Sequence, residues 1–156
     1  MNVFVTGGAG YIGSVCVEEL INAGNKVTVY DNLTEGHRSA IDKRSAFVQG
    51  DLSDEARLAQ ALQQAKAGAV LHFAANALVG ESMANPGKYF RNNVSSALNL
   101  LEAAVAARVN KFIFSSTCAV YGVPDRVPMT EDLPLRPINP YGESKQIGRA
   151  SCRERV

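Results

Sequence analysis

Three evenly spaced glycines follow directly on an apolar run near the start of the chain. The run Val3–Val5 is typical of a strand, and Gly7, Gly10 and Gly13 then precede a helix-patterned stretch. One glycine permits a sharp turn out of the strand, one lets the backbone approach a diphosphate, and one lets the helix pack closely on the strand. The N-terminus of the helix directs N–H groups and a positive dipole end at the same place. The pattern therefore predicts a dinucleotide-binding loop.

An acidic residue stands where such a loop requires one. Asp31 ends the alternating run Lys26–Tyr30, close to the roughly 20-residue spacing of the dinucleotide fingerprint. A carboxylate there accepts hydrogen bonds from ribose hydroxyls and repels a 2′-phosphate, so NAD is favoured over NADP. His37 and Arg38 keep NADP open, because an arginine near this acid can accommodate the phosphate. The alternative for Asp31 is a strand-end aspartate that caps a turn.

The composition limits the classes of function. The 156 residues suffice for one domain with a core, and a net charge of +1 gives no electrostatic case for nucleic acid or a membrane surface. The apolar stretches fall short of the roughly 18 residues of a membrane span, and we expect no signal peptide because a strand begins so early. Cys16, Cys118 and Cys152 have neither metal spacing nor a disulfide pattern. We expect a cytoplasmic protein without a metal site.

Strand-like runs alternate with helix-patterned segments along the chain. This alternation predicts βαβ units, and the expected fold class is α/β, a doubly wound parallel sheet of the NAD-binding Rossmann type. Prolines crowd residues 124–140, which predicts an extended surface loop. The expected strands are Val3–Val5, Val27–Tyr30, Ala46–Val48, Ala69–Phe73 and Phe112–Phe114.

Three helices are expected between these strands. The first covers Tyr11–Asn22 and stops at Gly24, the second covers Asp54–Ala65 with Ser53 or Asp54 as its N-cap, and the longest covers Lys88–Ala107. The apolar faces expected for the first and the longest helix are Ile12, Val15, Cys16, Leu20 and Ala23, and Phe90, Val94, Ala97, Leu98, Leu101 and Val105, respectively.

Candidate catalytic groups follow the fifth strand. Ser115–Thr117 is a hydroxyl cluster at the strand's carboxyl end, where open sheets bind ligands. Tyr141 and Lys145 are four residues apart, so in a helix they share one face, and an ammonium group stabilises the phenolate that a tyrosine needs as a base. The pair alone is weak evidence, because an ordinary helix with a solvated lysine matches it. The glycine loop, the hydroxyl cluster and the Tyr141–Lys145 pair occur in this order along the chain, and this order favours a catalytic role for the pair.

The motifs resemble those of the extended short-chain dehydrogenase/reductase family, and within it the UDP-glucose 4-epimerases. The resemblance covers the chain from Met1 to about Ile147, and HFAANALVGES is its most specific motif. The motifs are VTGGAGYIGS at 5–14, DNLTEGHRS at 31–39, GDLSD at 50–54, HFAANALVGES at 72–82, NNV at 92–94, KFIFSSTCAVYG at 111–122 and NPYGESK at 139–145.

The resemblance implies a role for each matching position. Thr117, Tyr141 and Lys145 would be catalytic, with Tyr141 as the base and Lys145 also binding the nicotinamide ribose. No metal is implied. Cofactor contacts, most of them around the glycine loop and the strand ends, are implied for Gly7, Gly10, Tyr11, Ile12, Gly13, Asp31, Asn32, Asp51, Leu52, Phe73, Ala74, Ala75, Asn93, Tyr141 and Lys145.

Several positions have a simpler interpretation. His72 is expected to be a satisfied strand histidine rather than a base, and Cys118 a small buried residue without a histidine partner. Asp51 can merely end a strand, and Asn93 can face solvent from a helix. Ala77 departs from the family, because some epimerases have a lysine there; one binding interaction is in doubt, but no catalytic group.

The end of the chain departs from the family pattern. We expect residues 1–147 to be an incomplete NAD-binding Rossmann domain, 148–156 an atypical tail, and the substrate-binding domain to be absent, so that the chain is an inactive, C-terminally truncated fragment. Cys118 and Ala119 replace the acidic pair of related dehydratases, which favours an epimerase. The expected partners are a UDP-sugar in the full-length form and a second copy in a homodimer. Another NAD-dependent nucleotide-sugar epimerase or dehydratase and a non-catalytic NAD-binding module remain alternatives.

Overall fold

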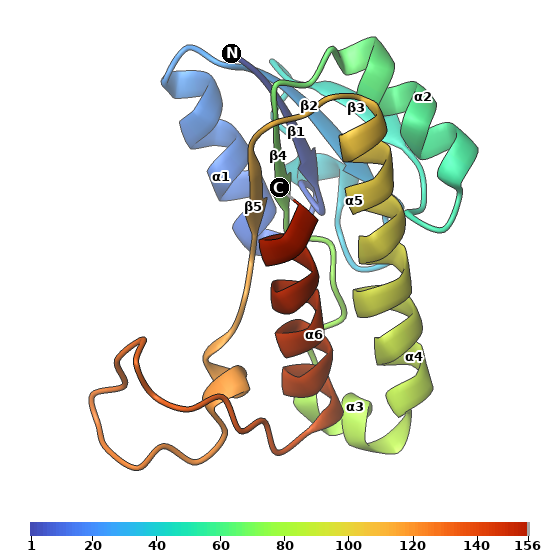
Figure 1. Cartoon of the computed structure of the whole chain (residues 1–156). Helices are drawn as coiled ribbons and strands as arrows, with labels where there is room; N and C mark the ends of the chain where they lie inside the picture. Colours follow the sequence, from blue (N-terminus) through green and yellow to red (C-terminus); the bar gives the residue numbers. More distant parts are fainter. Residues whose placement is uncertain (156) are drawn as a thin grey trace.

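Five parallel strands form one sheet in the order β3-β2-β1-β4-β5 (Figure 1). The structure, a computed structural model, describes residues 1–155, with side chains through residue 151. The strand order reverses between β1 and β4, which opens a crevice at the carboxyl ends of the strands. The doubly wound sheet predicted from the sequence is confirmed. The strands are β1 (Asn2–Thr6), β2 (Lys26–Asp31), β3 (Ala46–Gln49), β4 (Ala69–His72) and β5 (Phe112–Phe114).

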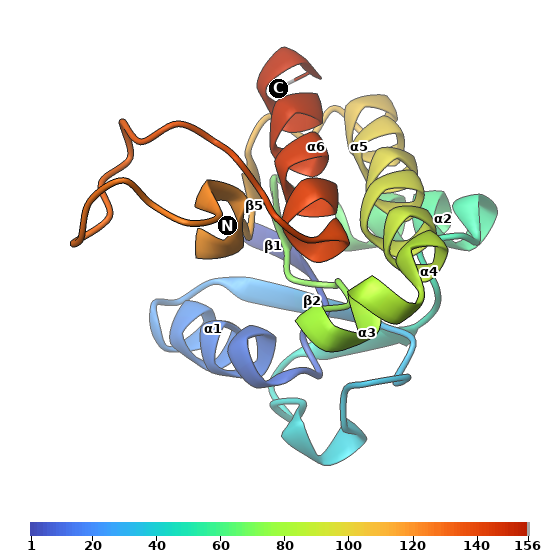
Figure 2. The same cartoon turned by 90° about the horizontal axis from the view of Figure 1, so that it is seen from below.

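Helices cover both faces of the sheet. One face carries α1 (Tyr11–Asn22); the other carries α2 (Glu55–Ala65), α5 (Ser96–Ala106) and α6 (Pro140–Arg155), as the view from below shows (Figure 2). The remaining elements lie between β2 and β3 or toward the crevice. They are η1 (Arg38–Ala40), α3 (Val79–Ala84), α4 (Pro86–Phe90), the π-helical turn η2 (Arg91–Ser95) and the 3-10 turn η3 (Cys118–Tyr121).

The two faces of β1 build separate cores, because successive strand side chains point to opposite sides of a sheet. Val3 and Val5 pack with Val17 of α1 and with valines of β2. Phe4, between them in sequence, packs with Leu58 and Leu62 of α2 and with Leu100 of α5 on the other side. The sheet is therefore buried on both faces where β1 lies.

The face of α1 that meets the sheet differs from the predicted one. Gly13 and Val17 are buried, with Leu20 and Ile21 packed beside them. Ile12 and Val15 are 59% and 52% exposed, so of the predicted face only Leu20 joins this core. The apolar pattern predicted the wrong face because the closest contact of α1, with the loop at Gly7 and Gly8, is made by Gly13, which has no side chain to count as apolar.

The long predicted helix is three elements. Instead of one helix from residue 88 to 107, α4 passes through the π-helical turn η2 into α5, and α3 precedes them. A π turn adds a residue per turn and rotates everything after it, which shifts the buried stripe. Ala97 and Leu101 are buried as expected, but Val105 is 52% exposed, and Leu100 and Ala104 are buried instead.

The boundaries of the other helices follow from local chemistry. Asp54 is the N-cap of α2, and its side chain accepts a hydrogen bond from the backbone N–H of Arg57 at 3.0 Å. Gly24 follows α1 with φ of +81° and donates its N–H to the Ile21 carbonyl, which ends the helix as predicted. The proline-rich segment is an extended loop that projects from the sheet, drawn in orange in Figure 1.

Neither a membrane-crossing helix nor a group of metal ligands occurs among the described residues. None of their helices is long and apolar enough to cross a membrane. In the same part of the chain, no three or more His, Cys, Asp or Glu side chains form a group that could hold a metal ion.

Gly13→Ala is expected to destabilise the fold. An added Cβ would lie 2.1 Å from the Gly7 carbonyl oxygen and 2.9 Å from the Gly8 Cα, so α1 or the loop must move. We expect a loss of about 2 kcal/mol or more in the free energy of unfolding, measured by urea denaturation. Gly80→Ala is the matched control: nothing lies within 4 Å of its added Cβ, and alanine is the better helix former by about 1 kcal/mol. Equal stability of the two variants would contradict the packing role of Gly13.

Candidate active site at the carboxyl edge of the sheet

The loop after β1 is shaped by contacts that only glycine allows. Gly7 has φ of +73° and donates its N–H to the Tyr30 carbonyl at 3.0 Å. A Cβ on Gly7 would lie 2.5 Å from the backbone nitrogen of Ala74, at the end of β4. Gly10 lines a cavity, and the nearest atom to a Cβ added there is the Gly7 oxygen at 3.4 Å. The three glycines therefore turn the chain, face the cavity and admit the helix, as the spacing predicted.

The Asp31 carboxylate ties this loop to the end of β2. It is 7% exposed, and its Oδ2 accepts a hydrogen bond from the Ala9 backbone N–H at 3.0 Å. Its Oδ1 accepts from the Leu33 N–H at 2.8 Å, so Asp31 also caps the turn, as the alternative interpretation had it. Two carboxylate oxygens offer about four acceptor positions. Asp31 therefore keeps acceptor capacity for a ligand in the cavity that it lines.

A cavity of about 740 Å³ opens where the strand order reverses. Its volume lies within the roughly 300–1,000 Å³ of small-molecule sites. Nine of the predicted cofactor residues line the cavity: Gly7, Gly10, Asp31, Asn32, Asp51, Leu52, Phe73, Ala74 and Ala75.

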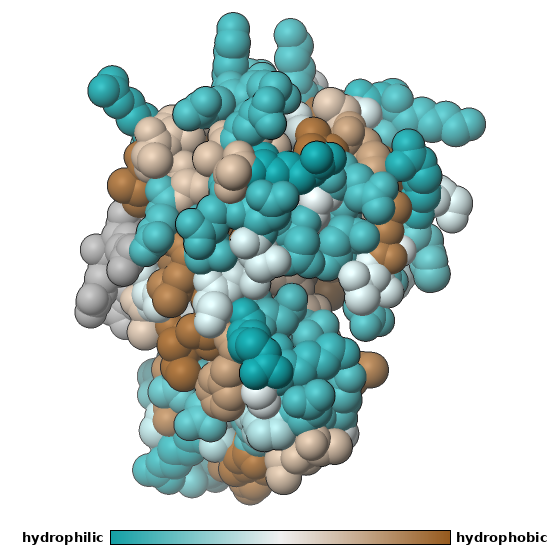
Figure 3. Space-filling view, turned by 90° about the vertical axis from the view of Figure 1, so that its right-hand side faces the viewer, coloured by the Kyte–Doolittle hydropathy of each residue, from teal (hydrophilic) through white to brown (hydrophobic). Residues whose placement is uncertain are grey.

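The outer surface of the molecule on the side of α2, α4 and α5 is mostly hydrophilic (Figure 3).

Asp51 is held by its neighbours at the end of β3. Its carboxylate accepts hydrogen bonds from the Ser53 hydroxyl at 2.6 Å, the Ser53 N–H at 2.9 Å and the Asn32 amide at 2.6 Å. The hydrogen bonds from Ser53, with that from Asn32, lower the pKa of Asp51. The Tyr30 hydroxyl donates to the Asp51 carbonyl at 2.9 Å, and burial is the main cause that raises the pKa of Tyr30 to about 12. The wall at β2 and β3 is thus acidic and fixed in shape.

Asn93 lies behind the cavity wall rather than in it. It is 1% exposed, and its amide nitrogen donates to the Asn76 carbonyl at 2.9 Å and to the Ser144 hydroxyl at 3.1 Å. Its Oδ1 accepts from the Asn76 N–H and the Asn92 amide, both at 2.9 Å. The solvent-facing alternative for Asn93 is therefore wrong. Asn92, which the sequence analysis passed over, lines the cavity in its place.

The α4–α5 wall of the cavity was not predicted from the sequence. Its residues are polar positions on a stretch expected to form one amphipathic helix, and of these only Asn92 lies in a motif, NNV at 92–94. The lining residues not predicted are Tyr30, Thr34, Glu35, Gly36, Gly50, Ser53, Asn76, Lys88, Arg91, Asn92, Ser95, Ser96 and Asn99.

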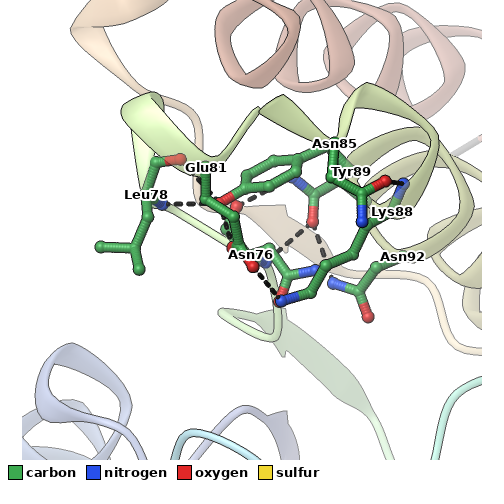
Figure 4. Close-up of polar contacts among 8 residues, drawn as sticks. Asn76, Leu78, Glu81, Asn85, Lys88, Tyr89 and Asn92 are labelled. Carbon is green, nitrogen blue, oxygen red and sulfur yellow. Dashed lines mark hydrogen bonds and ion pairs between the residues drawn. The ribbon is translucent and has the colours of Figure 1, made fainter. Parts of the chain in front are cut away.

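Lys88 is held in place by a network that the close-up shows (Figure 4). Its ammonium donates to Glu81 Oε1 at 2.5 Å, and this bond is the main cause that lowers the pKa of Glu81. Glu81 Oε2 lies 2.8 Å from the hydroxyl of the buried Tyr89, which also accepts from the Leu78 N–H at 3.0 Å. Burial and Glu81 raise the pKa of Tyr89 to about 12. The network anchors α3 on α4.

Tyr11 and Ile12 occupy the first turn of α1, with side chains 88% and 59% exposed. Neither residue lines the cavity, and the backbone contact implied for them stays a prediction. Gly13 lies one turn further along the same helix, packed on the loop.

The three candidate catalytic residues lie on two elements that contact each other, η3 and α6. Thr117 is the N-cap of η3, and its hydroxyl accepts from the Ala119 N–H at 3.2 Å. Tyr141 is half-buried in the first turn of α6, with its ring edge-on to Tyr89 at 6.3 Å between centroids. Lys145, one turn later, is 3% exposed and donates to the Ser115 carbonyl at 2.8 Å. A solvated lysine, as in the ordinary-helix alternative, is excluded.

His72 is the satisfied strand residue that the sequence predicted. It is 1% exposed, its Nδ1 lies 2.7 Å from the Thr6 hydroxyl, and its ring packs against Phe112 and Phe114. Cys118, in contrast, is exposed, so the expectation of a small buried residue is wrong. The reason is local: η3 projects Val120 inward and leaves its first residue outside.

Residues 3–155 match the model of the NAD dependent epimerase/dehydratase family. The chain belongs to this family. It is 50% identical to the UDP-glucose 4-epimerase of Lactobacillus helveticus over 147 residues, which are 94% of this chain and 44% of that protein. The UDP-glucose 4-epimerase of Rhizobium meliloti is 49% identical over 146 residues, again 94% of this chain and 44% of the relative.

Solved structures of family members agree with the fold. The Brucella ovis UDP-glucose 4-epimerase in complex with NAD superposes with a TM-score of 0.95 at 47% identity, covering 98% of this chain and 47% of that one. The Bifidobacterium longum UDP-glucose 4-epimerase in complex with NAD⁺ and UDP gives a TM-score of 0.95 at 36% identity, covering 99% and 48%. The chain therefore spans less than half the length of these family members.

The buried imidazole of His72 predicts a loss of stability in mild acid. Burial, with the nearby Lys145 ammonium, lowers the pKa of His72 from its ordinary 6.5 to about 3. Between these values the unfolded chain binds a proton that the folded chain does not, so falling pH favours unfolding. This group contributes up to about 1.4 kcal/mol per pH unit below 6.5.

The measurement is the free energy of unfolding in urea at pH 7 and pH 5. We expect the native chain to lose about 2 kcal/mol more over this interval than His72→Gln, which does not titrate. The exposed His37 is the second histidine of the chain and is common to both proteins. Parallel pH dependences would show that His72 is protonated in the folded state.

Proposed function

We propose that the cavity binds NAD. The support is that one continuous surface joins a glycine loop at a helix N-terminus, the Asp31 carboxylate and the ends of β3 and β4. Gly7 and Gly10 fit a diphosphate, because the loop closes tightly on the protein side and has open space on the cavity side. The acidic ends of β2 and β3 fit the ribose and adenine end.

The surroundings of Asp31 favour NAD over NADP. Glu35 adds a second carboxylate to the cavity lining near Asp31. Arg38, which left NADP open in the sequence, has its guanidinium 4.9 Å above the ring of Phe47. A cation held over an aromatic face is stabilised there, so Arg38 is engaged away from a 2′-phosphate.

We further propose that this chain is the cofactor-binding part of a UDP-glucose 4-epimerase, which interconverts UDP-glucose and UDP-galactose. NAD, when bound, supplies reversible oxidation at C4 of the sugar. Tyr141 acts as the base that holds the proton of the sugar 4-hydroxyl, and Thr117 hydrogen-bonds the same oxygen. Lys145 binds the nicotinamide ribose and stabilises the tyrosinate. The single observation that carries the proposal is the buried Lys145 one turn from Tyr141 on a helix that contacts η3.

The chemistry of η3 favours an epimerase over a dehydratase. Elimination of water requires a general acid at the leaving hydroxyl. The four residues of η3, Cys118–Tyr121, contain no carboxylate. A range of nucleotide sugars remains open, since a Campylobacter jejuni relative of similar fold is a UDP-Glc/GlcNAc 4-epimerase.

Tyr141→Phe in the full-length protein is expected to abolish most turnover and to leave NAD bound. The phenol is the proposed base, and loss of a general base costs about 100-fold or more. The measurements are UDP-galactose formation and NAD affinity by calorimetry. Tyr121→Phe, on η3, serves as the control with near-native turnover. Normal turnover by Tyr141→Phe would overturn the assignment.

A polypeptide of residues 1–156 alone is expected to bind NAD weakly and to show no turnover of UDP-glucose. The reason is that the chain spans 44% of the length of the Lactobacillus helveticus relative, so more than half of that protein has no counterpart here. An assay of this polypeptide beside the full-length protein measures both properties. Turnover by residues 1–156 would place the sugar site within this chain. Turnover of other nucleotide sugars alone by the full-length protein would change the substrate and keep the mechanism.

The assembly and location of the full-length protein also remain proposals. We propose a homodimer in the cytoplasm with a UDP-sugar as substrate partner. Relatives of similar fold were solved with such ligands, for example the Thermotoga maritima UDP-glucose 4-epimerase with UDP-glucose. Analytical ultracentrifugation of the full-length protein measures the oligomeric state directly.

A further inference from the structure

The ammonium of Lys145 lies over an aromatic ring. Its Nζ is 4.8 Å from the centroid of the Phe114 ring, and it donates to the carbonyl of the next residue, Ser115, at 2.8 Å. Lys145 is 3% exposed, so water contributes little to the solvation of this charge. The end of β5 therefore offers the ammonium two electron-rich partners from adjacent residues, a ring face and a carbonyl oxygen.

The Phe114 ring is itself fixed in place. A Cβ built on Gly148, one turn beyond Lys145 on α6, would lie 2.6 Å from Cζ of the ring. The His72 ring packs on it with a centroid distance of 5.5 Å and an interplanar angle of 44°. The ring thus contacts β4 and two successive turns of α6, and Lys145 and Gly148 share one face of that helix.

We propose that Phe114 is a positioning residue for the reaction: its ring face holds the Lys145 ammonium at the height on α6 where it serves Tyr141. This inference rests on the proposed function and adds a residue outside its site. A ring face carries the negative part of the aromatic quadrupole and attracts a cation most strongly when water is excluded. An aliphatic side chain of similar size would fill the space and lack this attraction.

Phe112 provides the matched comparison. It lies two residues earlier on the same strand, half-buried like Phe114, and its ring also packs on His72, at 6.3 Å. The described cation–ring contact of Lys145 is with Phe114. A role in packing against His72 alone would make the two phenylalanines equivalent, whereas the positioning role distinguishes them.

The test weakens the ring quadrupole and leaves the shape of the ring almost unchanged. Phenylalanine fluorinated at ring positions 2 and 6 is incorporated at 114, or at 112, in the full-length protein, because the Cζ and Cε atoms of the Phe114 ring are the ones that face Gly148. We expect turnover of UDP-glucose to fall between about 3- and 10-fold for the 114 variant, from the weakening of a desolvated cation–ring contact. The variant stays folded, with only a small fall in the unfolding midpoint because the same contact also stabilises the folded state, and the 112 variant stays within about 2-fold of native turnover.

Two further variants separate the possible failures. Phe114→Leu is expected to lose at least as much turnover as the fluorinated variant. Lys145→Met tests the proposed function itself: native turnover and native NAD affinity in that variant overturn the site and this inference together. Loss of turnover in Lys145→Met with equal, near-native turnover of both fluorinated proteins overturns only the role of Phe114.

Discussion

The contact between α1 and the loop after β1 is the constraint on which the site depends. Gly13 brings the helix so close that a single methyl group would meet the Gly7 carbonyl at 2.1 Å. The positive φ of Gly7 turns the loop toward the end of β4, and the Asp31 carboxylate fixes it through the Ala9 N–H. Helix dipole, loop backbone and acid therefore converge on one side of one cavity, and each is positioned by contact with the others.

A second set of contacts attaches α6, which carries the proposed catalytic pair, to this framework. Asn93 joins the end of β4 to Ser144 on α6, and Lys145 reaches the Ser115 carbonyl at the end of β5. The Asn93–Ser144 bond is buried and the Lys145 side chain is 3% exposed. An unpaired polar group is costly at such positions, so these contacts specify the position of α6. The proposed chemistry needs this, because Tyr141 and Thr117 lie on different elements and must meet at one substrate oxygen.

Local patterns predicted what local physics decides. The apolar runs of the central strands β1, β2 and β4 are largely buried, those of the shorter strands β3 and β5 only in part, and all five strands lie where they were expected. The glycine loop was found because backbone conformation restricts the residue types there, and Asp31 because it ends a strand at the spacing of the dinucleotide fingerprint. The buried stripe of α4–α5 was predicted only in part, because the π turn changes the helical period and no residue type in the sequence indicates such a turn. Asn92 and Asn93 are the same residue type. Only their positions in that turn make Asn92 a cavity residue and Asn93 a buried one.

The sequence by itself determined the fold class, the dinucleotide loop, the acid at the end of β2 and the Tyr141–Lys145 spacing, since each depends on residues near one another in the chain. The tertiary structure decided which face of α1 is buried, that the ordinary residues Lys88, Arg91 and Asn99 form a cavity wall, and that Lys145 lies over Phe114. These depend on how distant segments pack. Contacts between such segments depend on how whole helices and strands are rotated and spaced relative to one another, and a local residue pattern does not specify this.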